Sequence, residues 1–294
     1  MIITSIEGVR DPFILVESGV YYLYGTGIKT ENDWENTEWV CYVNRGGKLD
    51  GNWEKTKHRI YEIPRFAKKE FWAPEVHPYK GAYYMFSTYY SSATKHRGCA
   101  VLKASSPTGP FSEISNGHIT PKDWNAIDAT LYVDREGQPW FIFVNEWVCT
   151  DDNIGRMAAA KLSDDLTQMI STPVELFRAD APVWTDRQVT DGCFMYTTKE
   201  NQLWMLWSNF DRDGYTVAVA HSQNGKIDGK WEHEPAPIYK KGSGNLYDGG
   251  HGMIFTALDG QKYLSIHSPN LPCGRERVVF IPICEKNGTL VCEA

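Results

Sequence analysis

The sequence predicts an all-β fold, a five-bladed β-propeller with four antiparallel strands in each blade, formed by residues 1–294 as a single domain. Three observations lead to this prediction. A pattern consisting of a polar or ionisable residue, an apolar strand, a turn and an aromatic-rich strand occurs five times. A second hairpin follows each occurrence, and helical periodicity is absent. Aromatic residues make up 13% of the chain, with 25 Gly and 15 Pro, which is typical of many short strands joined by tight turns.

The first hairpin of each unit contains a turn with Gly or Asn where a hairpin needs one: ESG, YKG, REG, KEN and LDG. The five segments read RDPFILVESGVYYLYGT from Arg10, APEVHPYKGAYYMFSTYY from Ala73, IDATLYVDREGQPWFIFVN from Ile127, TDGCFMYTTKENQLWMLWSN from Thr190 and GGHGMIFTALDGQKYLSIHSPN from Gly249. These hairpins are expected to form the two inner strands of the blades.

The second hairpin of each unit supplies the two outer strands. Its first strand reads WVCYVN, GCAVLKAS, RMAAAKLS, YTVAVAHS and RVVFIPIC in chain order. Its second strand is short and reads GNWEKT, GPFSEI, LTQMIS, GKWEHE and GTLVCE. The residues that start the five units lie 64, 53, 63 and 60 positions apart, too far for a WD-type blade of about 40–45 residues. A two-sheet sandwich is the alternative, but it gives no reason for a fivefold recurrence.

Composition and charge exclude several classes of partner. The net charge of −7 disfavours nucleic acid and anionic membranes, and no uncharged apolar stretch approaches the roughly 18 residues of a membrane span. The first residues, MIITSIEGVRDPF, show neither a basic region nor a long apolar core, so no signal peptide is predicted. The seven cysteines lack CxxC spacing, which favours buried free thiols over disulfides or a zinc site. The sequence does not predict an oligomeric state.

The residues that start the five innermost strands are expected to meet at one mouth of the central channel, because these strands run in the same direction. They are Asp11, Glu75, Asp128, Asp191 and His251. Crowding like charges at a partly desolvated mouth raises at least one carboxyl pKa, and proteins usually tolerate this cost where acid–base chemistry or a cation uses it. One protonated and one ionised carboxyl group across a narrow channel are what an inverting glycosidase requires.

Aromatic side chains near this mouth could stack on a sugar ring. Trp72 and Trp147 are the predicted substrate-binding residues of this kind, with Trp34 as a further candidate. Packing between blades is the alternative role for each of them.

At these residues the sequence resembles glycoside hydrolase family 43, five-bladed propellers that hydrolyse arabinosides, xylosides and galactosides with inversion. The resemblance covers nearly the whole chain. RDPFILVESGVYYLYGT is similar to the family's first blade and implies Asp11 as the general base. FWAPEVHPYKGAYYMF from Phe71 is similar to the second blade, where Glu75 is expected to bind substrate. AIDATLYVDREG from Ala126 is similar to the third, which implies Asp128 as the residue that tunes the pKa and orientation of the acid.

The resemblance also implies a metal and an arginine. GGHGMIF from Gly249 is similar to the stretch whose His lies on the channel axis, often beside a bound calcium, so His251 is the predicted metal ligand. An Arg late in the chain often contacts the catalytic acid in this family, and Arg277 is the candidate, with Arg275 as the alternative. No organic cofactor is implied.

The fourth blade departs from the family, which typically has Glu-Gly-Pro with the Glu as general acid. This chain has Asp191-Gly192-Cys193, and an Asp is one methylene shorter. Three alternatives stay open. The backbone compensates and Asp191 is the acid, which is favoured; another carboxyl supplies the proton; or the chain is a weak or inactive relative.

Two functions follow from these observations. The first is an inverting, exo-acting glycoside hydrolase of oligo- or polysaccharides, closest to an α-L-arabinofuranosidase, with β-xylosidase and galactofuranosidase or galactanase as related activities. The second is a carbohydrate-binding propeller that has lost catalysis. The carboxyl groups retained at Asp11 and Asp191 favour the enzyme.

Overall fold

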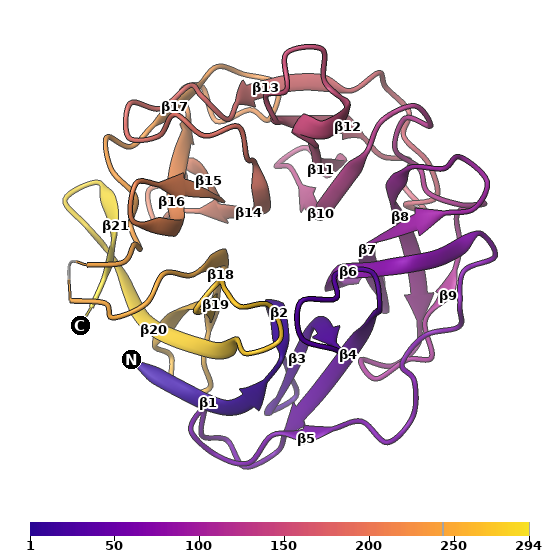
Figure 1. Ribbon diagram of the computed structural model, residues 1–294, viewed down its shortest axis with the longest axis horizontal. Coiled ribbons are helices and arrows are strands. Elements are labelled where there is room, and N and C mark those ends of the chain that lie inside the picture. Colours follow the sequence, from indigo (N-terminus) through magenta and orange to yellow (C-terminus); the bar gives the residue numbers. More distant parts are fainter. Residues whose placement is uncertain (243, 294) are drawn as a thin grey trace.

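Five antiparallel sheets form a ring around a central channel (Figure 1). The structure, a computed structural model, describes residues 1–242 and 244–293. The innermost strands of the five sheets, β2, β6, β10, β14 and β18, contact their neighbours around the ring. The predicted five-bladed propeller is therefore confirmed. In the described part of the chain, no helix has the length and apolar character needed to cross a membrane.

The first four blades follow the chain from the channel outward. Blade one contains β2 (Val9–Glu17), β3 (Val20–Ile28), β4 (Thr37–Asn44) and β5 (Glu54–Lys55). Blade two contains β6 (Ala67–Tyr79), β7 (Ala82–Ser91), β8 (Arg97–Ala104) and β9 (Ser112–Glu113). Blade three contains β10 (Ala126–Val133), β11 (Pro139–Asn145), β12 (Arg156–Lys161) and β13 (Val174–Arg178), with a short 3-10 helix (Trp147–Cys149) after β11. Blade four contains β14 (Asp191–Thr197), β15 (Leu203–Asp211), β16 (Gly214–Ser222) and β17 (Trp231–His233).

Blade five joins the two ends of the chain. It contains β18 (Gly250–Thr256), β19 (Lys262–Ser268) and β20 (Arg277–Lys286), and both β1 (Ile2–Glu7) and β21 (Thr289–Cys292) pair with β20. The register places Ile2 opposite Phe280 and Cys292 opposite Ile283. β1 therefore pairs with the first part of β20, and β21 pairs with the last part. The sequence predicted β21 but missed β1, because this strand has no hairpin partner near it in the chain.

The outer strand of blade three also differs from its prediction. LTQMIS, residues 166–171, was expected to form it, whereas the strand is β13 (Val174–Arg178). Leu166 has a left-handed backbone with φ 61°, which a strand does not allow. The segment instead turns back on the end of β12, and Leu162 forms an isolated bridge with Met169.

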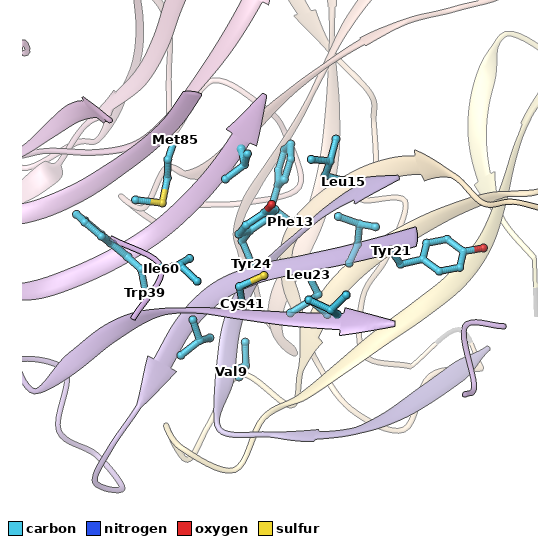
Figure 2. Packing of buried hydrophobic residues seen from close by; sticks show 14 of the residues in the cluster. Val9, Phe13, Leu15, Tyr21, Leu23, Tyr24, Trp39, Cys41, Ile60 and Met85 are labelled. Carbon is cyan, nitrogen blue, oxygen red and sulfur yellow. The ribbon is translucent and has the colours of Figure 1, made fainter. Parts of the chain in front are cut away.

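Apolar side chains of adjacent blades pack against each other and form the core. Figure 2 shows Tyr24, Trp39 and Cys41 of blade one together with Met85 of β7 in blade two, all of them buried. All seven cysteines are free, as predicted, and four are buried: Cys41, Cys99, Cys193 and Cys273. The close packing between blades fixes where the innermost strands begin, and with them the residues at the channel mouth.

Candidate active site

A pocket of about 370 Å³ opens at the channel mouth where the innermost strands begin, and all five blades contribute to its wall. Four carboxylates, an imidazole and a guanidinium line it together with five aromatic side chains. They are Asp11, Asp128, Glu146, Asp191, His251, Arg10, Trp34, Trp72, Trp147, Phe210 and Tyr215. The predicted residues Asp11, Asp128, Asp191, Trp72, Trp147 and His251 are therefore brought together.

A β-bulge at the start of each innermost strand shapes this mouth. The register of each inner hairpin shifts at this point, and the first shifted residue has a left-handed backbone with φ between 42° and 55°. The five bulge residues are Asp11, Ala73, Asp128, Gly192 and His251. Such a conformation costs most residues about 1–2 kcal/mol, so the surrounding structure must hold it in place.

The bulges correct the predicted equivalence of the five starting residues. Asp11, Asp128 and His251 are equivalent, but Asp191 lies one residue before the bulge of blade four, and Glu75 lies two residues after that of blade two. Asp191 therefore reaches the pocket from a different backbone position than the other two aspartates. Glu75 points elsewhere and does not line the pocket.

Side chains from neighbouring blades hold the bulge amides. The amide of Asp11 donates to Nδ1 of His267 at 3.3 Å, and that of Ala73 donates to Oγ1 of Thr26 at 2.7 Å. The amides of the other three bulges donate to Thr88 Oγ1 (from Asp128, 3.0 Å), Asp128 Oδ2 (from Gly192, 3.0 Å) and Ser208 Oγ (from His251, 2.8 Å). Each blade thus holds the bulge of the next blade around the ring in place.

Asp11 is held as a carboxylate. Thr26 Oγ1 donates to its Oδ2 at 2.6 Å, and Nδ1 of His251 lies 3.2 Å from its Oδ1. Burial raises the pKa of Asp11, but the nearby charges of His251 and Arg10 outweigh it and lower the pKa well below its usual range. Asp11 is consequently ionised at neutral pH.

Asp191 is held in the opposite state. Burial, followed by the neighbouring charge of Asp128, raises the pKa of Asp191 to about 8, although a hydrogen bond of 3.0 Å from the Tyr215 hydroxyl to Oδ2 lowers it. Its carboxyl group therefore carries a proton at neutral pH. One pocket holds an ionised and a protonated aspartate, the combination that general acid–base chemistry needs.

Asp128 and His251 are further buried titratable groups of the pocket. Burial raises the pKa of Asp128 to about 6. Burial lowers the pKa of His251, but Asp11 and Asp128 outweigh it and raise that pKa to about 10. The His251 imidazolium lies 3.7 Å from Oδ2 of Asp128 as well as beside Asp11, so it offsets part of their mutual repulsion.

The comparisons with known proteins agree with this geometry. The sequence profile of the glycosyl hydrolases family 43 matches residues 5–289. The chain belongs to glycoside hydrolase family 43. It is a glycoside hydrolase, as the sequence predicted.

Three relatives illustrate its place in family 43. An endo-arabinase from Bacteroides thetaiotaomicron, known from its crystal structure, is 34% identical in sequence to this chain, with a TM-score of 0.82 and a match that covers 97% of both chains. The extracellular endo-α-(1→5)-L-arabinanase 1 of Bacillus subtilis is 22% identical over 84% of this chain and 74% of its own. The extracellular exo-α-(1→5)-L-arabinofuranosidase ArbA of Cellvibrio japonicus is 26% identical over 54% of this chain, and the match spans only 45% of that relative.

Two predicted substrate-binding residues do not reach the family 43 pocket. Glu75 is buried with its Oε2 3.0 Å from Nε2 of His77. Arg277, at the start of β20, pairs with Glu7 of β1, so its predicted contact with the acid is wrong. The alternative, Arg275, pairs with Glu31 at 3.0 Å.

The arginine that lines the pocket is Arg10, which sequence reasoning missed. Its guanidinium bonds to Asn270 and Glu276 and lies 4.5 Å from the centre of the Trp34 ring. A basic residue directly before Asp11 in an otherwise apolar strand was the available signal.

Glu146 also lines the pocket and was missed by the sequence analysis. It is 4% exposed, and Oε2 accepts a hydrogen bond of 2.6 Å from Nε of Arg97, whose guanidinium also lies 5.2 Å from the Trp72 ring. Burial raises the pKa of Glu146 to about 7, although Arg97 lowers it. A glutamate directly after the apolar run PWFIFVN was the signal that could have identified it.

The side chains around His251 are paired with one another. Calcium takes six to eight oxygen ligands, and within residues 1–242 and 244–293 no group of three or more His, Cys, Asp or Glu side chains is arranged to hold a metal. Nδ1 of His251 faces Asp11 and Asp128, and a protonated imidazole has no lone pair for a metal. Calcium at His251 stays a prediction.

Proposed function

We propose that this chain is an inverting hydrolase of α-1,5-linked L-arabinan and arabino-oligosaccharides, with Asp191 as general acid and Asp11 as general base. The observation that carries the proposal is the pair of opposite protonation states in one pocket, with Asp11 ionised and Asp191 protonated. The arabinan substrate is inferred from the relatives, three of which are named for it.

In the proposed reaction, Asp191 donates its proton to the glycosidic oxygen as the bond from that oxygen to the anomeric carbon breaks. A water molecule attacks the anomeric carbon from the opposite face and gives a proton to Asp11. The products are a free sugar of inverted configuration and the shortened chain. Asp128 raises the pKa of Asp191, which keeps the acid protonated before the reaction.

We propose exo action, because all five blades contribute to the wall of a pocket of about 370 Å³, a size in the range that holds one or two sugar units. Trp34, Trp72 and Trp147 line the pocket and offer ring faces for stacking on sugars. Endo action is the second candidate, favoured by the likeness to the Bacteroides and Bacillus enzymes. Chromatography of a linear arabinan digest separates the two, since exo action releases a single product size from the start and endo action releases a range of oligosaccharides.

The catalytic roles are tested by Asp191→Asn and Asp11→Asn. Asp191→Asn should abolish hydrolysis of arabino-oligosaccharides but retain much of the activity on nitrophenyl arabinofuranoside, whose leaving group needs little protonation. Asp11→Asn should abolish both activities, because both need an activated water. Asp191→Glu restores the residue that family 43 typically has and measures whether the backbone suits the shorter acid.

If Asp191→Asn keeps full activity on oligosaccharides, Asp191 is not the acid, and Glu146 is then the next carboxyl to test. A wild-type protein that binds but does not cleave arabinan would support the carbohydrate-binding alternative.

A further inference from the structure

The five bulge amides are not held in the same way. In four inner hairpins, the residue before the bulge pairs in register with a polar residue of the second strand: Thr26, Thr88, Ser208 or His267. Each of these four side chains accepts the bulge amide of the next blade around the ring. The arrangement recurs because every blade meets the next at the same place.

Blade three breaks this rule. The residue at the equivalent position is Val144, which lies opposite Ile127 and is fully buried. Val144 has no polar side-chain atom to accept the next bulge amide, that of Gly192. This amide donates instead to Oδ2 of Asp128 at 3.0 Å. Gly192 is the residue directly after Asp191, so the bond joins Asp128 to the backbone that carries the acid.

Gly192 suits this role for a second reason. It has φ 52°, and a Cβ at this position would lie 2.8 Å from the His251 ring. Only glycine lets the strand pass this close to His251 while its amide points at Asp128. The bond is also assisted by the charge of the carboxylate, which makes it stronger than a bond from an amide to a hydroxyl.

We propose that Val144 is a positioning residue for the hydrolytic reaction. By offering no hydroxyl, it leaves the Gly192 amide to Asp128 and so fixes the carboxylate of blade three relative to the acid of blade four. This inference rests on the proposed function, in which Asp191 donates the proton.

The test is Val144→Thr, which is nearly isosteric and adds a hydroxyl where Thr26 and Thr88 carry theirs. We expect this hydroxyl to accept the hydrogen bond of the Gly192 amide, so that Asp128 loses that bond. The value of kcat on arabino-oligosaccharides should then fall on the order of tenfold or more, because small misplacements of catalytic groups are costly. KM should stay within about twofold, because the substrate contacts are unchanged. The loss should be smaller on nitrophenyl arabinofuranoside, which needs the acid less.

Val144→Ala is the matched control, because it removes packing without adding a hydroxyl. It should lower the unfolding temperature but keep kcat within about twofold of wild type. An equal loss of kcat in Val144→Ala and Val144→Thr would overturn the proposal, since packing alone would then explain the effect.

A spectroscopic measurement keeps this test separate from the proposed function. In protein labelled with ¹⁵N-glycine, the Gly192 amide proton should shift in Val144→Thr and stay near its wild-type position in Val144→Ala. An unmoved Gly192 amide in Val144→Thr overturns the proposal whether or not the enzyme is active. Absence of arabinan hydrolysis by the wild type would instead overturn the proposed function.

Discussion

The Tyr215 hydroxyl donates a hydrogen bond of 3.0 Å to Oδ2 of Asp191, from a buried position against His267. This bond lowers the pKa of Asp191, while burial and Asp128 raise it to about 8. Tyr215 therefore helps to set the pH above which the acid loses its proton.

Changing Tyr215 to Phe should move the alkaline limb of activity to higher pH. The acid must be protonated to act, so wild-type kcat/KM should fall as the pH rises through about 8. Without the tyrosine hydroxyl the pKa of Asp191 rises further, and the fall should begin roughly one pH unit later. The measurement is kcat/KM on arabino-oligosaccharides between pH 5 and 10. Tyr196 lies on β14 of blade four, and its hydroxyl donates to Glu285 of blade five. Tyr196→Phe removes this hydroxyl and should leave the alkaline limb in place.

Thr26→Val should weaken the general base. The Thr26 hydroxyl accepts the amide of Ala73, which directs its own proton to Oδ2 of Asp11. Valine has nearly the same shape but holds neither group, so kcat should fall on the order of 10- to 100-fold. The loss should be equal on oligosaccharides and on nitrophenyl arabinofuranoside, because both need the activated water. Thr26→Ser keeps the hydroxyl and should retain most of the activity; a Val variant as active as the wild type would show that Thr26 does not position Asp11.

Glu146→Gln should weaken substrate binding more than turnover. Glu146 lines the pocket beside Arg97, and a carboxylate accepts stronger hydrogen bonds from sugar hydroxyls than an amide does. We expect KM to rise on the order of tenfold with little change in kcat. Since the pKa of Glu146 is about 7, wild-type KM should fall as the pH rises through 7, and this dependence should vanish in the variant. Glu175→Gln breaks an exposed contact to Arg156 and should change neither constant.

Chelation tests the metal that the family resemblance implied. Oδ1 of Asp11 faces His251, its Oδ2 accepts from Thr26, and Oδ2 of Asp128 accepts from Gly192, so these carboxylates already have partners. We expect EDTA treatment followed by desalting to leave kcat and the unfolding temperature unchanged. A loss of activity that calcium restores and magnesium does not would contradict this expectation and show that the enzyme needs calcium.

The architecture could be predicted from the sequence because the repeated pattern itself determines the local structure. Each unit encodes two hairpins through alternating apolar residues and turn residues, and five such units must close a ring to bury their faces. The strand that lacked this signal, β1, was missed because its partner β20 is at the other end of the chain. The outer strand of blade three was misplaced because LTQMIS has the composition of a strand, while the left-handed Leu166 inside it was not recognisable.

The site was only partly predictable for a related reason. The aspartates were found as polar residues at strand starts, but a β-bulge shifts the register locally, and its position cannot be counted from the sequence. Asp191 and Glu75 were therefore aligned with residues to which they are not equivalent. Arg10 of β2, Tyr215 of β16 and Glu146, directly after β11, enter the pocket from positions that the sequence shows as ordinary core or loop. Arg277 was chosen by its place late in the chain, and its partner Glu7 lies on the strand that was missed.

The pairing of β1 with β20 has a consequence for biosynthesis. The Thr4 hydroxyl donates to the carbonyl of Val278, 274 positions later, so β1 has no partner until the segment that forms β20 has been synthesised. Blades one to four can each assemble as they emerge, whereas the fifth cannot be completed before β20 has emerged. A nascent chain stalled before β20 would hold an open ring with the unpaired edge of β1 exposed, the kind of edge that recruits chaperones or other strands.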